Sequence, residues 1–130
     1  MSQTIIINER VILIRINKLY HELMSPDELY EATRGIWKVG PRRNGVEYAF
    51  AIYNALVKEV YKVHNWYPAC TFEYKTRNVF QAIQNIEKIN RWEFDGEIAE
   101  SNVRDKYICK SVKNYLPSYG GANPITYVNC

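Results

Sequence analysis

The chain has 130 residues, a net charge of +3 and 47% hydrophobic residues, which fits one globular domain, residues 1–130, with its own core. So small a charge excludes a protein that coats polyanions, and any basic site must come from local clustering. Three cysteines without a C-x-x-C spacing argue against a disulfide framework and a cysteine zinc site. No apolar run approaches a membrane span. We expect a cytoplasmic protein with reduced thiols and no membrane partner.

The first third of the chain predicts a strand and a helix. The β-branched run at residues 11–16 is typical of a strand that is buried on both faces. Ser25 and Glu28 have the spacing of a capping box, which predicts a helix from Pro26 to about Arg34. Gly35 is placed to end this helix in a left-handed conformation.

A hairpin is predicted next, after a brief strand at 36–39 and a loop at 40–45. Residues 48–53 alternate large and small side chains, and residues 56–66 form the partner strand after a tight turn at 54–55. We expect Lys58 and Lys62 to share one face of the second strand. The large side chains on its other face are then Val57, Tyr61 and Val63.

The last part of the chain has weaker signals. Residues 78–90 predict a loop or a short helix, residues 99–107 a short helix, and residues 125–128 a final strand. Residues 91–96 alternate as a strand with Trp92 and Phe94 inward. The acidic residues of that strand, Glu93, Asp95 and Glu97, are then expected on its solvated face.

This order of elements predicts an α+β fold. We expect a small twisted or barrel-like, mostly antiparallel sheet, with two or three short helices that cover its open ends.

Motifs for catalysis and metal binding are absent from the sequence. His21 and His64 are far apart and belong to no H-E-x-x-H pattern, and there is no G-x-S-x-G elbow or phosphate loop. We therefore expect neither a metal nor another cofactor and no catalytic residues. An enzyme is the less favoured alternative.

Basic and aromatic side chains cluster locally instead. Cations beside flat rings suit a ligand that combines a phosphate with a base, because arginine binds phosphate bidentately and aromatic rings stack on bases. A structural role is the alternative for some of them: Arg34 suits the negative end of a helix dipole, and tryptophans, Trp92 above all, can be core residues. Arg77 and Arg91 flank the irregular middle segment. The candidate ligand-binding residues are Arg34, Trp37, Lys38, Arg42, Arg43, Trp66, Arg77, Lys110 and Ser111.

Some of these residues form a pattern that resembles a known family. The runs Glu31-Ala32-Thr33-Arg34-Gly35-x-Trp37, Gly40-x-Arg42-Arg43 and Arg91-Trp92-Glu93-Phe94-x-Gly96 are similar to an uncharacterised bacterial domain that follows GIY-YIG nuclease domains. The hairpin followed by Arg-Trp-x-Phe-x-Gly is similar, more distantly, to the PUA-like superfamily with its EVE and ASCH domains. This resemblance implies a small barrel that binds RNA, modified bases or nucleotides. It implies no cleavage, because the nuclease half is missing, and Cys109 stands where the pattern has glycine before Lys110.

We therefore predict a non-catalytic module that binds a nucleotide or a modified base in nucleic acid. In this hypothesis Trp37 and Trp66 stack on the ring, while basic side chains meet the phosphate. Two alternatives stay open. One is a free-standing, phage-encoded sponge that sequesters a nucleotide-derived signalling molecule. The other is a protein-interaction or assembly module, such as a homo-oligomer built through tyrosines and an edge strand.

Overall fold

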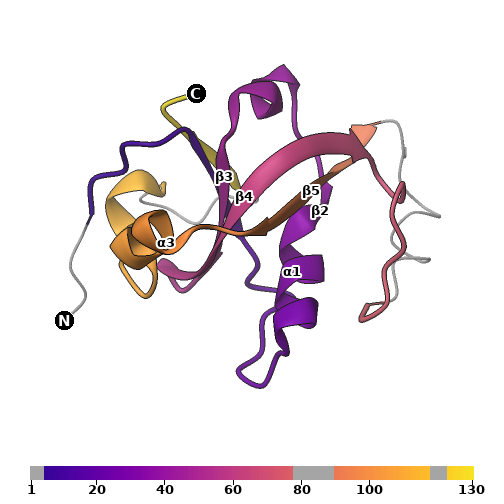
Figure 1. Cartoon of the computed structure of the whole chain (residues 1–130), viewed down its shortest axis with the longest axis horizontal. Coiled ribbons are helices and arrows are strands. Elements are labelled where there is room, and N and C mark those ends of the chain that lie inside the picture. Colours follow the sequence, from indigo (N-terminus) through magenta and orange to yellow (C-terminus); the bar gives the residue numbers. More distant parts are fainter. Residues whose placement is uncertain (1–4, 78–89, 118–122) are drawn as a thin grey trace.

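A computed structural model describes residues 5–77, 90–117 and 123–130. Six strands form one sheet of order β2-β5-β4-β3-β1-β6, which curls into half a barrel around the long, bent β4 (Figure 1). All pairs of neighbouring strands are antiparallel except β1 and β3, which are parallel. The elements in chain order are β1 (Val11–Arg15), α1 (Pro26–Arg34), β2 (Gly35–Trp37), the 3-10 helix η1 (Pro41–Gly45), β3 (Tyr48–Tyr53), β4 (Leu56–Pro68), β5 (Trp92–Ile98), α3 (Ser101–Tyr107), the 3-10 helix η3 (Lys113–Tyr115) and β6 (Ile125–Val128).

The predicted fold class is confirmed: the chain is α+β, with a small, curled, mostly antiparallel sheet and two short α-helices in the described part. Its strands and α-helices lie close to their predicted positions, whereas residues 78–89 of the predicted loop or helix lie outside the described residues. Among the described residues, no helix combines the length and the apolar character needed to cross a membrane.

Hydrophobic side chains pack on both faces of the sheet. Val103 and Tyr107 of α3 belong to the cluster on one face, and Leu29 and Tyr30 of α1 pack against the cluster on the other. The two helices therefore cover opposite faces. The central strands are buried on both sides, as predicted for residues 11–16.

Both ends of α1 are as predicted, at Pro26 and Arg34, but the conformation of the residue that follows it is not. The Ser25 side chain accepts a hydrogen bond from the Glu28 amide, and the Ser25 amide donates to the Glu28 carboxylate, each at 3.1 Å. The predicted left-handed Gly35 is wrong, because its φ of −170° and ψ of 168° are extended. Glycine is required there for close approach: a Cβ would lie 2.1 Å from Tyr74 Oη and 2.8 Å from Glu93 Cβ. The chain thus passes directly from the helix into β2.

The hairpin of β3 and β4 has the predicted turn. Asn54 and Ala55 both have positive φ, 51° and 64°, as a type I′ turn requires. The predicted faces of β4 are only partly correct, however: Tyr61 and Val63 pack with the same core cluster, but Val57 does not. The register shifts at Lys58, so Val57 packs in one core cluster while Tyr61 packs in the other. One extra residue in a strand reverses the alternation of side chains beyond it.

The predicted solvated face of β5 is also wrong at Glu93. This glutamate has no exposed surface, although its neighbours in the alternation, Asp95 and Glu97, are half-buried and exposed. A glutamate in such a place needs partners from elsewhere in the chain.

Close packing between β4 and β5 gives a test of the sheet. A Cβ built on Gly96 would lie 2.2 Å from the carbonyl oxygen of Lys62. To relieve this clash, the backbone of β4 or β5 would have to shift. We expect Gly96→Ala to lower the free energy of unfolding by about 1–3 kcal/mol, the usual cost of overpacking, as measured by urea denaturation. Gly40→Ala is the matched control, because nothing lies within 4 Å of its Cβ. Equal effects of the two substitutions would contradict this packing.

Candidate functional site

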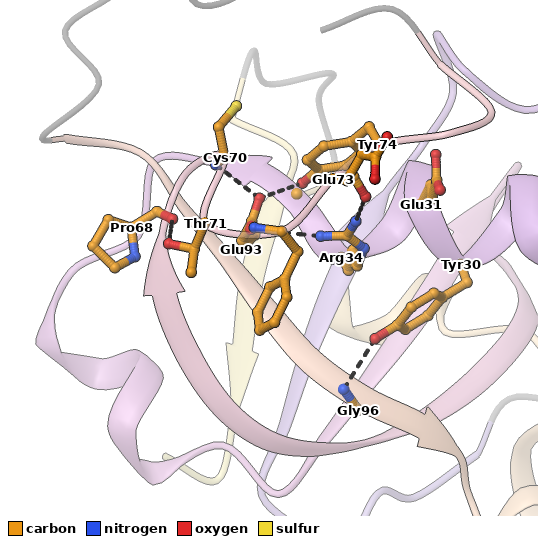
Figure 2. A network of polar contacts seen from close by, with 12 residues as sticks. Tyr30, Glu31, Arg34, Pro68, Cys70, Thr71, Glu73, Tyr74, Glu93 and Gly96 are labelled. Carbon is orange, nitrogen blue, oxygen red and sulfur yellow. Dashed lines mark hydrogen bonds and ion pairs between the residues drawn. The ribbon is translucent and has the colours of Figure 1, made fainter.

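The buried carboxylate of Glu93 is the centre of a polar network (Figure 2). Its oxygens accept hydrogen bonds from the amides of Cys70 and Phe72, at 2.9 and 2.7 Å, and from the Tyr74 hydroxyl at 2.7 Å. The guanidinium of Arg34 lies 3.6 Å away. Glu93 therefore has charged and neutral partners that compensate for its removal from water.

Arg34 belongs to this network. Its side chain is buried, its Nη2 donates to the carbonyl oxygen of Glu73 at 2.8 Å, and its guanidinium lies 4.0 Å from the centre of the Tyr74 ring. Burial and the bond to Glu93 raise the pKa of the Tyr74 hydroxyl, which keeps it protonated as a donor. The structure thus places this predicted phosphate-binding arginine inside the protein, opposite a carboxylate.

A second buried carboxylate, Glu31 on α1, holds the next part of the same loop. It accepts hydrogen bonds of 2.7–3.0 Å from the amides of Lys75 and Thr76 and from the Thr76 hydroxyl. Burial opposes its ionisation, but these hydrogen bonds outweigh that effect and lower its pKa. Glu31 and Glu93 together fasten residues 70–76 to α1 and β5.

Arg77 follows directly after this fastened loop. Its Nη1 donates to the carbonyl oxygen of Glu31 at 2.9 Å and to that of Gly35 in the edge strand β2. Its guanidinium also lies 5.3 Å from the centre of the Tyr74 ring. Burial lowers the pKa of Arg77, and an arginine stays charged at neutral pH even so. The network therefore fixes a cation beside β2.

A groove of about 850 Å³ lies at this place. Its described lining includes residues of β2 at one edge of the sheet and Asn123 and Pro124, which precede β6 at the other edge. It therefore occupies the open side of the half-barrel. No acidic side chain is among the described residues that line it, and its basic ones are Arg15, Lys18, Lys38, Arg77 and Arg91.

Trp37 supplies an aromatic ring to the groove. Its indole nitrogen donates to the carbonyl oxygen of Thr33 in the last turn of α1 at 2.7 Å, so the ring orientation is fixed by the fold. The half-buried Leu19 and the edge of Ile36, which is 7% exposed, add apolar surface. The described lining offers cations, amides and apolar groups, and no carboxylate, imidazole or thiol. Such a set binds an anion with a flat or apolar part.

Of the nine predicted residues, the structure brings three together in the groove: Trp37, Lys38 and Arg77. It shows Arg91 there too, which flanks the middle segment in sequence. Sequence reasoning missed Arg15 and Lys18. Their only signal is their position at the end of an internal strand, which says nothing about a groove.

Of the six others, Arg34 belongs to the buried network, and the remaining five lie elsewhere. Arg43 stacks 3.5 Å from the centre of the Trp92 ring, and Arg42 donates to the carbonyl oxygen of Cys130 at 3.1 Å. The Trp66 ring packs 5.4 Å from that of Phe94. Lys110 and Ser111 pair through their backbone with the start of β4. None of the five is among the lining residues of the groove.

No protein-family model matches the chain, and neither the curated proteins nor the solved structures show a significant match to it. The resemblances to the domain behind GIY-YIG nucleases and to PUA-like proteins therefore remain predictions. The candidate site rests on geometry alone.

The carboxylate of Glu31 predicts a pH dependence of stability. Its pKa is lowered in the fold from the ordinary value of 4.5, so its contribution is complete above that value and is lost as the pH falls through the folded pKa. We expect Glu31→Gln to cost about 1–3 kcal/mol at pH 7, because the amide has no charge and keeps only one of the two oxygens that accept from buried donors. The difference from the unsubstituted protein should shrink toward pH 3, as urea denaturation at several pH values would show.

The exposed Glu22 is the matched control for this experiment. Glu22→Gln should leave stability unchanged throughout the series. If Glu31→Gln behaved in the same way, the loop would not depend on the Glu31 carboxylate.

Proposed function

We propose that the chain is a non-catalytic binding module for a nucleotide or for a base within nucleic acid, with the groove beside Trp37 as its site. One observation carries the proposal: five basic side chains and a fixed indole ring line one groove that has no acid among its described residues. A nucleotide has the complementary parts, a flat ring and a phosphate.

Three of the five cations of the groove have no carboxylate partner within the described part of the chain. Lys18, Lys38 and Arg91 form no ion pair there, whereas basic residues elsewhere do, as Arg104 does with Glu59 at 2.6 Å. The groove also holds more positive charge than the net +3 of the whole chain. Uncompensated charge in a concave site attracts anions.

The size of the groove supports a free nucleotide as a second candidate ligand. Its volume of about 850 Å³ lies within the range of about 300–1,000 Å³ that is usual for small-ligand pockets. A sponge for a nucleotide-derived signal would use the same ring and phosphate contacts. The two functions differ in salt dependence, because only nucleic acid releases many condensed counterions.

Lys38→Ala tests the proposal. We expect it to weaken the binding of short single-stranded RNA or DNA, and to reduce the slope of log affinity against log salt by about 0.7 for the lost phosphate contact. Fluorescence anisotropy over a salt series measures both. Free nucleoside monophosphates in the same assay test the second candidate.

The control is Lys113→Ala, which removes an exposed lysine that is not among the lining residues of the groove. It should leave the affinity and the slope unchanged. Equal effects of the two substitutions, or no binding of oligonucleotides and nucleotides by the unsubstituted protein, would contradict the proposal.

A further inference from the structure

We infer that the groove selects a ligand with a phosphate on each side of its nucleoside, one at the 3′ and one at the 5′ position. This class comprises an internal nucleotide of a single strand and a nucleoside 3′,5′-bisphosphate, rather than a nucleotide with all its phosphates on one side. The inference rests on the proposed function and specifies its ligand.

The cations of the groove come from two separate parts of the sheet. Arg15 ends β1 and Lys18 follows it, and β1 neighbours the edge strand β6. Lys38 follows β2, Arg77 is bonded to β2 through Gly35, and Arg91 precedes β5, the partner of β2. We call these sets the β1 bank and the β2 bank. In the sheet order β2-β5-β4-β3-β1-β6, strands β3 and β4 separate them, so the two banks reach the groove from opposite ends of the curled sheet.

Apolar side chains come from both parts of the groove. Leu19, which is half-buried, follows Lys18, and Ile36, 7% exposed, lies in β2 beside Trp37. Apolar surface therefore accompanies the cations on each side, and an indole ring accompanies those of the β2 bank. A nucleoside flanked by a 3′ and a 5′ phosphate can use both banks at once, whereas two phosphates on the 5′ side leave one bank without an anion.

The separation of the banks is set by the fold. Arg15 donates to the backbone carbonyl oxygen of Asn123, before β6, and Arg77 donates to that of Glu31 at 2.9 Å. Each bank thus contains an arginine that donates to the backbone, through an exposed hydrogen bond for Arg15 and a partly buried one for Arg77. Cations that are positioned before binding favour one spacing of anions over others, because little conformational freedom is lost on binding.

Isothermal titration calorimetry with ligands of equal phosphate number tests the inference. We expect a nucleoside 3′,5′-bisphosphate to bind about tenfold more tightly than the 5′-diphosphate of the same base, which is the effect of one additional charge-assisted contact. Inorganic pyrophosphate, which lacks the ring, should bind more weakly than either. Equal affinities for the bisphosphate and the 5′-diphosphate would overturn the inference and leave the proposed function intact.

Variants of the two banks identify the source of this preference. Lys18→Ala removes a cation of the β1 bank and Lys38→Ala one of the β2 bank, and each should reduce the preference for the bisphosphate toward onefold. Lys113→Ala should leave it at about tenfold. A preference that survives both groove substitutions would overturn the inference. Failure of every nucleotide and oligonucleotide to bind would instead refute the proposed function itself.

Discussion

The burial of the Glu93 carboxylate is the constraint on which the region around the groove depends. A carboxylate without exposed surface is tolerated only with close partners, and removal of one partner leaves an uncompensated charge. Those partners come from α1, through Arg34, and from the loop after β4, through two amides and Tyr74. If the loop left β5, the Glu93 carboxylate would therefore either become exposed or stay buried without its hydrogen-bond donors.

The position of Arg77 follows from the same network. Because Glu93 and Glu31 fix residues 70–76, the next residue is held beside β2, where it donates to Glu31 and Gly35. Arg34 therefore affects the groove indirectly. It neutralises the buried Glu93 carboxylate and so helps to hold the loop that leads to Arg77. The open side of the half-barrel gains a positioned charge next to Trp37.

Local features of the fold could be predicted from the sequence, because their causes are local. The capping box of Ser25 and Glu28 and the turn at Asn54 and Ala55 need only neighbouring residues. Glu93 could not be placed, since alternation in a strand does not reveal that amides from another segment surround one acid. The bulge at Lys58 was equally hidden, because it changes the register without changing the composition of the strand.

The candidate site was only partly predictable for the same reason. Trp37 and Lys38 are neighbours in the sequence, so the local cluster of basic and aromatic residues was enough to predict both as ligand-binding residues. Arg15 and Lys18 meet them only because the sheet curls and brings its two ends toward one groove.

The most direct test of the groove as the ligand site is an NMR titration of the protein with a nucleoside 3′,5′-bisphosphate, followed through side-chain N–H signals. We expect the Trp37 indole and Arg77 guanidinium signals to shift with one common affinity. The Arg104 signal, from an arginine paired with Glu59, should stay in place. Shifts confined to Arg42 and Arg43, or signals of Trp37 and Arg77 that do not respond while the ligand binds, would contradict it.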